Sequence, residues 1–190
     1  MRLFTGIAIG AEVLDALEQA MRELRPLAPL NWSPLENLHI TSKFIGEWPE
    51  QRLGEMTQAL GEVHAPAAFP AKVARFGYLP NPRNPRMLYA GVQAGPELGD
   101  LARLTEDALA PLGVAREERA YTPHVTLSRI GARIGNKPIG ALREHIANMK
   151  NAEFGTFQVA EFHLYLSTNR PGGSGSAYKA LATFPLGSHA

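Results

Sequence analysis

The sequence predicts an α+β fold built of two similar lobes, and three observations lead to that prediction. First, His39-Ile40-Thr41 returns as His124-Val125-Thr126, and the two histidines are 124 − 39 = 85 residues apart. Second, the same offset relates further segments, among them Leu3-Phe4 with Leu88-Tyr89, Gly6-Ile7 with Gly91-Val92, and Ile45-Gly46 with Ile130-Gly131. Third, short apolar runs typical of strands alternate with segments of helical spacing. A unit this long, present only twice, is no solenoid repeat, so each copy is expected to supply one lobe.

Composition indicates an ordinary globular chain. Hydrophobic residues make up 45% and charged residues 19% of its 190 residues, which is far from the composition of a disordered protein. The absence of cysteine excludes a disulfide framework and a thiolate metal site. The N-terminal apolar run is too short for a signal peptide, and no segment approaches the length of a membrane span. We therefore expect a cytoplasmic protein without a membrane association.

The charge is unevenly distributed along the chain. Residues 71–143 hold eleven Lys or Arg against six Asp or Glu, a local balance of +5, so the other residues sum to −4 within the net charge of +1. Such a bias would help to attract a polyanion, although ordinary solvated charge explains it as well.

The expected elements of the first copy, residues 2–79, follow from periodicity and from turn-forming residues. Its strands are expected at residues 3–9, 38–45 and 69–79, and its helices at residues 11–24 and 49–63. The first helix carries apolar residues on one side, and the second begins at a proline. Prolines 26, 29 and 34 interrupt the chain between the first helix and the second strand, where they predict a loop that carries Trp32.

The second copy, residues 87–166, repeats this order. Its strands are expected at residues 87–92, 124–128 and 154–166, and its helices at residues 97–109 and 138–149. Residues 80–86 are dense in turn formers, so they are expected to be a mobile link between the lobes. Residues 169–176 predict a long hairpin loop before a last strand at about residues 177–186; the loop lacks the Lys-Ser/Thr of a phosphate-binding P-loop. A frayed tail, residues 188–190, would close this single domain of residues 1–190.

The two His-x-Thr motifs are the candidate active site. Because side chains alternate along a strand, His39 and Thr41 should share one face while Leu38, Ile40 and Ser42 share the other. Two copies related by a pseudo-twofold can bring two imidazoles and two hydroxyls around one cavity. One imidazole can then be neutral while the other is protonated, which suits in-line displacement at phosphorus. The threonine hydroxyls can donate to the phosphate oxygens.

Two other uses of these residues remain open. Each His-x-Thr could be a pair of half-buried polar residues satisfied by its neighbours. The histidines could also bind a metal, although neither strand offers Asp, Glu or Cys as a third ligand. The remaining histidines have no counterpart in the other copy and are expected at the surface: His64, His145, His163 and His189.

These motifs and their flanks resemble the two-histidine (2H) phosphoesterase superfamily. The resemblance is closest to the RNA 2′,3′-cyclic phosphodiesterases, also called 2′-5′ RNA ligases or LigT-like proteins. It is carried by Arg2-Leu3-Phe4, by Leu38-His39-Ile40-Thr41 with Lys43-Phe44-Ile45-Gly46-Glu47, and by Pro123-His124-Val125-Thr126-Leu127-Ser128-Arg129, and it extends to Tyr178 and Phe184-Pro185-Leu186. The match covers nearly the whole chain, and it is specific because both motifs occur with their flanks.

The resemblance implies a fold and a set of roles. The fold would have two lobes, each an antiparallel sheet with helices on the outside, around a central cleft. His39 would protonate the leaving 3′ oxygen and His124 would activate water, without metal or cofactor, to give RNA with a 2′-phosphate end; ligation would be the reverse reaction. Thr41 and Thr126 would hold the phosphate. Ser42 departs from the family, which has an apolar residue there, and this departure concerns packing because Ser42 should face the core.

Two further residues are candidates for substrate binding. Arg129 follows the second motif as in the family, where an arginine near this place contacts phosphate, yet strict alternation puts it on the face opposite His124. It can reach the site only if the strand ends or bulges near Ser128; otherwise it forms a surface ion pair. Phe44 could stack on a base, but alternation puts it on the face of Ile40, where it would pack in the core.

Three functions therefore remain after the sequence is read. The first is a monomeric cyclic phosphodiesterase acting on RNA ends. The second is a phosphodiesterase for a small cyclic nucleotide such as ADP-ribose cyclic phosphate. The third is a non-catalytic module that binds RNA ends, which the presence of both proton-transfer residues disfavours.

Overall fold

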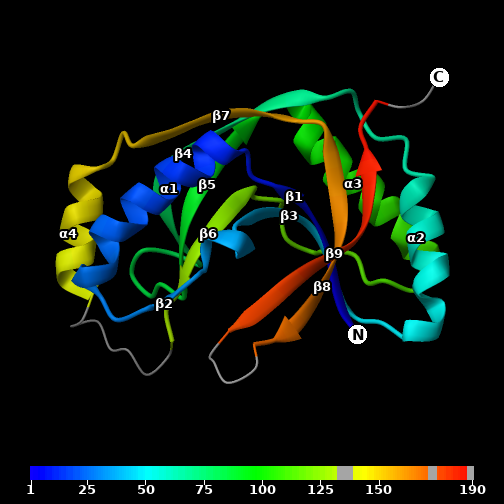
Figure 1. Ribbon diagram of the computed structural model, residues 1–190, viewed down its shortest axis with the longest axis horizontal. Coiled ribbons are helices and arrows are strands. Elements are labelled where there is room, and N and C mark those ends of the chain that lie inside the picture. Colours follow the sequence, from blue (N-terminus) through cyan, green and yellow to red (C-terminus); the bar gives the residue numbers. More distant parts are fainter. Residues whose placement is uncertain (132–138, 171–174, 188–190) are drawn as a thin grey trace.

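A strongly curved sheet organises the protein (Figure 1). The computed structural model describes residues 1–131, 139–170 and 175–187, and in these residues nine strands join in one antiparallel sheet. The strands are β1 (Arg2–Ala8), β2 (Asn31–Trp32), β3 (His39–Glu47), β4 (Phe69–Leu79), β5 (Met87–Ala94), β6 (His124–Arg129), β7 (Glu153–Val159), β8 (Glu161–Asn169) and β9 (Ser176–Pro185). Their order is β7-β4-β5-β6-β3-β1-β8-β9, and β2 pairs with β6. The fold is α+β, as predicted.

The helices cover the two ends of the curved sheet. They are α1 (Ala11–Leu24), α2 (Leu53–Gly61), α3 (Pro96–Leu109) and α4 (Gly140–Asn148), accompanied by the short 3-10 turns η1 (Arg25–Leu27), η2 (Leu35–Asn37), η3 (Glu50–Arg52) and η4 (Ala110–Leu112). Figure 1 shows α1 and α4 together beside one half of the sheet and α2 and α3 beside the other. No helix in the described residues is both long and apolar enough to cross a membrane.

The two sequence copies are interleaved in space. One half-sheet, β7-β4-β5-β6, takes β4 from the first copy, and the other, β3-β1-β8-β9, takes β8 and β9 from beyond the second motif. Helix α1 of the first copy packs against β7, and α3 of the second packs against β3. The repeat boundaries therefore do not coincide with the halves of the sheet. The predicted interlobe link, residues 80–86, is instead a hairpin loop, because Leu79 of β4 pairs directly with Met87 of β5.

The predicted strand 154–166 is wrong as a single element. It breaks at Ala160 into β7, which pairs with β4, and β8, which pairs with β1 at the far side of the sheet. The expected hairpin after β8 is present, with Asn169 opposite Ser176. The loop around Trp32 also contains the unexpected short strand β2, in which Trp32 pairs with Ser128. The predicted tail, residues 188–190, and the start of the helix at Pro138 lie outside the described residues.

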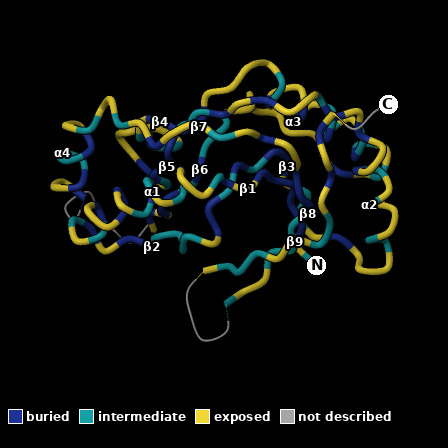
Figure 2. Tube along the Cα trace, turned by 45° about the horizontal axis from the view of Figure 1, so that its top comes forward, coloured by how far each residue is buried: buried dark blue, intermediate teal, exposed yellow. Residues whose placement is uncertain are grey.

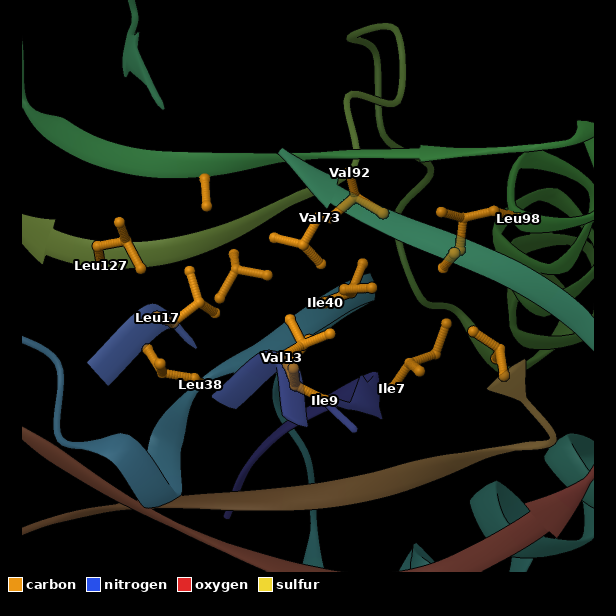
Figure 3. Close-up of a cluster of buried hydrophobic side chains, with 14 of the residues drawn as sticks. Ile7, Ile9, Val13, Leu17, Leu38, Ile40, Val73, Val92, Leu98 and Leu127 are labelled. Atoms are coloured by element: carbon orange, nitrogen blue, oxygen red, sulfur yellow. The ribbon is translucent and has the colours of Figure 1, made fainter. Parts of the chain in front are cut away.

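The core lies between the sheet and its helices. Figure 3 shows side chains of β1, α1 and β3 meeting those of β4, β5 and β6, and along the trace the buried residues follow the central strands while the helices keep an exposed outer face (Figure 2). Ile40 of β3 and Val125 of β6 have no exposed surface. Because these two residues lie between the histidine and threonine of each motif, the motif side chains face the opposite, concave side of the sheet.

Candidate active site

The two His-x-Thr motifs meet at the centre of the sheet. Strands β3 and β6 are antiparallel, and their single paired position joins Ile40 to Val125. Continuing that register by one residue in each direction sets His39 opposite Thr126 and Thr41 opposite His124. Side chains directly opposite in an antiparallel pair have Cβ atoms about 5 Å apart. The two imidazoles and two hydroxyls are thus brought around one point, with the pseudo-twofold axis passing between Ile40 and Val125.

Each imidazole is oriented by a backbone carbonyl two residues before it. The Nδ1 of His39 donates to the Asn37 carbonyl oxygen at 2.6 Å, and the Nδ1 of His124 donates to the Thr122 carbonyl oxygen at 2.7 Å. A carbonyl can only accept, so Nδ1 carries the proton and Nε2 is the position that titrates. In His39 this Nε2 accepts from the Thr41 hydroxyl at 3.0 Å. The repeat thus provides two proton-transfer groups of matched orientation.

The surroundings of the two histidines differ. The His39 ring lies 4.8 Å from the Phe4 ring, 5.1 Å from the Tyr178 ring and 6.0 Å from the Tyr165 ring, measured between centroids. The ring contact recorded for His124 is with Tyr89, at 5.4 Å. His39 is therefore the more enclosed of the two, and a cavity of about 120 Å³ lies beside it, lined in part by Leu35, Glu36, Asn37, Tyr165 and Tyr178.

Enclosure affects the titration of His39. Burial lowers the pKa of His39 below its ordinary value, and the nearby positive charges of His124 and Arg129 lower it further, whereas the hydrogen bond to Asn37 opposes these effects. Burial acts in this direction because it disfavours the charged form of an imidazole. The unliganded site therefore favours neutral His39, and an anion bound between the motifs would favour its protonation.

Matching β-bulges place Phe44 and Arg129 on the cleft side. In β3 the pairing with β1 skips Ser42, and in β6 the pairing with β5 skips Leu127, which is its repeat counterpart because 127 − 42 = 85. An extra residue in a strand reverses the alternation beyond it. Phe44 is consequently 62% exposed and its ring lies 6.4 Å from that of Phe4. Core packing of Phe44 is thus contradicted.

Arg129 occupies the corresponding position in β6, since 129 − 44 = 85. It is exposed and pairs with Met87 across the ladder. Its effect on the pKa of His39 indicates that its charge lies near the site. The bulge that a role for Arg129 requires near Ser128 is present, and no acidic side chain of the described residues forms an ion pair with Arg129.

Ser42 faces the core, as expected. Its hydroxyl lies 2.8 Å from that of Thr5 in a buried hydrogen bond. Two polar groups that satisfy each other replace the apolar contact that the family pattern has at this position, so the departure leaves the concave face unchanged.

Sequence reasoning missed a group of contacts that hold the segment before His124. Lys43 is buried, and its ammonium group donates to the Glu106 carboxylate of α3 and to the Ala115 carbonyl oxygen, the latter at 2.7 Å. Glu106 also accepts from the Glu117 backbone N–H at 2.6 Å. The signal in the sequence was a lysine within a predicted strand, and alternation alone would have placed it on the concave face.

Tyr121 adds a direct link between the two motifs. Its hydroxyl donates to the Thr41 carbonyl oxygen at 3.0 Å, although Tyr121 and Thr41 are 80 residues apart. Although Tyr121 is 37% exposed, desolvation raises the pKa of its hydroxyl, so the hydroxyl remains a donor at all ordinary pH values. The next residue along the chain is Thr122, whose carbonyl orients His124. The strand of the first motif therefore helps to position the histidine of the second.

The other histidines do not all lie at the surface. His163 is only 8% exposed, with Nδ1 2.9 Å from the Thr183 hydroxyl and Nε2 3.5 Å from the Glu161 carboxylate, so the surface prediction for it is wrong. His145 is half-buried, 3.8 Å from Glu23, and His64 is exposed; His189 lies outside the described residues. As for the metal alternative, residues 1–131, 139–170 and 175–187 contain no group of three His, Asp or Glu side chains suited to hold a metal ion.

Known proteins share both the repeat and the fold. The family model described as LigT like phosphoesterase matches residues 7–89 and again residues 92–174, and the two matches are offset by 92 − 7 = 85 residues. Proteins named RNA 2′,3′-cyclic phosphodiesterase from Methanocaldococcus jannaschii and Archaeoglobus fulgidus are 30% and 29% identical to the chain. These alignments cover 91% and 97% of the chain and 95% and 99% of the relatives.

Solved structures agree with this assignment. The crystal structure of a Thermus thermophilus protein superposes with a TM-score of 0.80 at 29% identity, over 100% of both chains. Escherichia coli LigT complexed with 3′-AMP has the same fold, with a TM-score of 0.77 at 23% identity over 98% of both chains. Since the family model matches both copies of the repeat and the relatives align over almost their whole lengths, the chain belongs to the LigT-like family of 2H phosphoesterases.

Proposed function

We propose that this protein hydrolyses the 2′,3′-cyclic phosphate ends of RNA to 2′-phosphate ends, with His39 and His124 as its acid and base. The observation that supports this most directly is the pair of His-x-Thr motifs on adjacent antiparallel strands, each imidazole held by a carbonyl through Nδ1 and left with Nε2 for proton transfer. The names of the relatives, RNA 2′,3′-cyclic phosphodiesterase, support the same substrate and the same class of reaction.

In the proposed reaction, Nε2 of His124 takes a proton from water as the water oxygen forms a bond to phosphorus. The bond from phosphorus to the 3′ oxygen breaks, and Nε2 of protonated His39 gives that oxygen its proton. One proton is taken and one is given, so the two histidines exchange protonation states in each turnover. Such a pair contributes most when both groups titrate near the working pH.

The hydroxyls of Thr41 and Thr126 would stabilise the non-bridging oxygens of the phosphate. Within the described residues Thr126 donates to the sulfur of Met87, at 3.3 Å, and sulfur is a weak acceptor that a phosphate oxygen can replace. Thr41 donates to Nε2 of neutral His39. When a bound phosphate favours protonation of His39, its Nε2 can no longer accept a hydrogen bond. The Thr41 hydroxyl is then free to donate to the phosphate.

Phe44 and Arg129 would complete the substrate site. Beyond the bulges they extend in opposite directions from the centre, so Phe44 lies past His124 and Arg129 lies on the side of His39. Arg129 would neutralise phosphate charge next to the acid, and Phe44 offers an exposed ring for a base. We also propose that the protein acts as a monomer, because both motifs come from the same chain; size-exclusion chromatography tests this. We further propose that it acts in the cytoplasm.

The test is to incubate the protein, with and without EDTA, with nucleoside 2′,3′-cyclic phosphates, ADP-ribose cyclic phosphate and an RNA ending in a cyclic phosphate. We expect hydrolysis in EDTA, with 2′-phosphate as the only product and the RNA as the preferred substrate. Binding without turnover would indicate an RNA-end binding module, and preference for ADP-ribose cyclic phosphate would indicate the small-nucleotide reaction. Incubating 5′-hydroxyl RNA with the product tests 2′-5′ ligation as the reverse reaction.

A further inference from the structure

Three adjacent strands of one half-sheet, β4, β5 and β6, carry positive charge without any acidic residue. The chain has no Asp or Glu from residue 63 to residue 96 or from residue 119 to residue 143. These two runs include β4, the 80–86 loop, β5 and β6, and the three strands are adjacent in the sheet. The six acidic residues between positions 71 and 143 all fall within residues 97–118, on α3 and the segment after it. The sequence bias noted above is therefore a separation of charge in space.

Four arginines gather where this half-sheet ends beside the active site. Arg129 closes β6 opposite Met87, and the residue after it, Ile130, donates its N–H to the Arg86 carbonyl oxygen at 2.9 Å. Arg83 lies three residues further into the loop. Arg143 of α4 reaches the same loop and donates to the Pro82 carbonyl oxygen at 2.9 Å. We name Arg83, Arg86, Arg129 and Arg143 the basic strip.

The 80–86 loop, which carries Arg83 and Arg86 of the strip, has a defined backbone. The Asn81 side-chain oxygen accepts from the backbone N–H groups of Arg83 and Asn84, each at 3.0 Å. Arg83 and Arg86 are exposed, and in the described residues neither forms an ion pair. By contrast, two arginines on helices form ion pairs. Arg22 pairs with Glu18, and Arg103 pairs with both Asp100 and Asp107. Uncompensated like charges repel one another, so their gathering at an ordered loop is typical of a surface that meets an anion.

The position of the strip indicates which anion it meets. In the proposed reaction His39 protonates the 3′ oxygen, so the terminal ribose lies on the His39 side of the phosphate, and the RNA chain continues from that ribose. Arg129 lies on the same side, because His39 is opposite Thr126 and Arg129 follows Thr126 in β6. We propose that the basic strip binds the phosphodiester backbone of the RNA upstream of its cyclic end. This inference rests on the proposed function and adds a reason for the enzyme to prefer a polymer to a mononucleotide.

Salt dependence of binding tests the strip separately from catalysis. The dissociation constant is measured for a labelled RNA oligonucleotide that ends in a 2′-phosphate and for a nucleoside 2′-phosphate, between about 50 and 200 mM salt. Each phosphate contact on a single strand contributes about 0.7 to the slope of log K against log salt. Substituting Arg83→Gln and Arg86→Gln together should therefore lower the slope for the oligonucleotide by about 1.4. The dissociation constant of this variant should then change about 7-fold less than that of the wild type between about 50 and 200 mM salt.

The matched control is Arg22→Gln with Arg103→Gln, which removes the same charge from two helices. We expect this control to bind the oligonucleotide as the wild type does, and both double variants to bind the nucleoside 2′-phosphate normally. An unchanged slope in the Arg83/Arg86 variant, or an equal loss of slope in the control, would overturn the proposal. Because the readout is binding of the product, it is obtained whether or not the protein turns over cyclic phosphates, so failure of the strip and failure of the proposed reaction are distinguishable.

Discussion

Substitution of Lys43 by methionine perturbs the contacts that join the first motif to the segment before His124. The Lys43 side chain is only 6% exposed, and its partner Glu106 is 19% exposed. Removing one member of a buried ion pair typically costs about 3–5 kcal/mol, because the other charge remains without a partner. In the variant Glu106 would remain partly exposed to solvent and would still accept from the Glu117 N–H. We therefore expect the free energy of unfolding to fall by about 2–3 kcal/mol. For a chain of this length that corresponds to a fall in Tm of about 4–12 °C.

The loss should depend on pH in a defined direction. Lys43 is the main cause of a pKa of Glu106 below its ordinary value of 4.5. A carboxyl group whose pKa is depressed by folding stabilises the protein above the pKa it has when unfolded, and that stability is lost as pH falls through the folded-state pKa. The difference in unfolding free energy between wild type and Lys43→Met should therefore be full at about pH 7 and shrink below about pH 4.5.

Chemical denaturation followed by circular dichroism measures both effects. Lys72→Met is the matched control, because Lys72 pairs with Glu153 at the surface, where the two side chains are 38% and 64% exposed. Exposed pairs contribute at most about 1 kcal/mol. If Lys43→Met were no less stable than Lys72→Met, or if its deficit did not change with pH, the contact between Lys43 and Glu106 would not stabilise this region as argued.

Two further predictions concern the site itself. Tyr121→Phe removes the bond to the Thr41 carbonyl and should cost about 0.5–1.5 kcal/mol of stability; it should also lower kcat, since Thr122 then orients His124 less well. Tyr78→Phe is the control, because the Tyr78 hydroxyl has no partner in the described residues, and equal kcat values for the two variants would contradict the positioning role. Arg129→Gln should raise the pKa of His39, because Arg129 lowers it, and so move the basic limb of kcat/KM to higher pH. A basic limb that stays in place would show that the Arg129 charge does not act on His39.

The repeat and the two motifs could be predicted from the sequence because they depend on local order. Alternation placed Ile40 in the core and His39 and Thr41 on the opposite face, and both hold because the strand is regular up to Thr41. Beyond that point alternation fails. Ser42 is skipped in the pairing with β1, so Lys43 turns into the helix layer and Phe44 turns out. Nothing in the composition of this segment marks the extra residue, because a bulge is set by the partner strand.

The assignment of strands to halves could not be predicted either. Matches at offsets 85 and 86 relate the two copies, but they do not say which sheet a strand joins. Residues on either side of Ala160 read as one apolar run, while β7 and β8 pair with strands on opposite sides of the sheet. The family model confirmed the repeat independently, with its two matches offset by 85 residues. Pairing over long separations along the chain decides where each copy lies.

The division of work between the two histidines is the central claim, and a change of leaving group tests it most directly. His39→Ala and His124→Ala are each expected to lower turnover of a 2′,3′-cyclic phosphate by roughly 10²- to 10⁴-fold. An aryl phosphodiester expels a stable anion that needs no proton, so His39→Ala should recover most of its turnover on that substrate, whereas His124→Ala should stay impaired because water still needs its base. Measuring both variants on both substrates from about pH 5 to pH 9, which covers the range of about pH 5 to pH 8 in which imidazole titrates, completes the test. Recovery of His124→Ala in place of His39→Ala would contradict the assignment, and equal recovery of both would contradict the separation of roles.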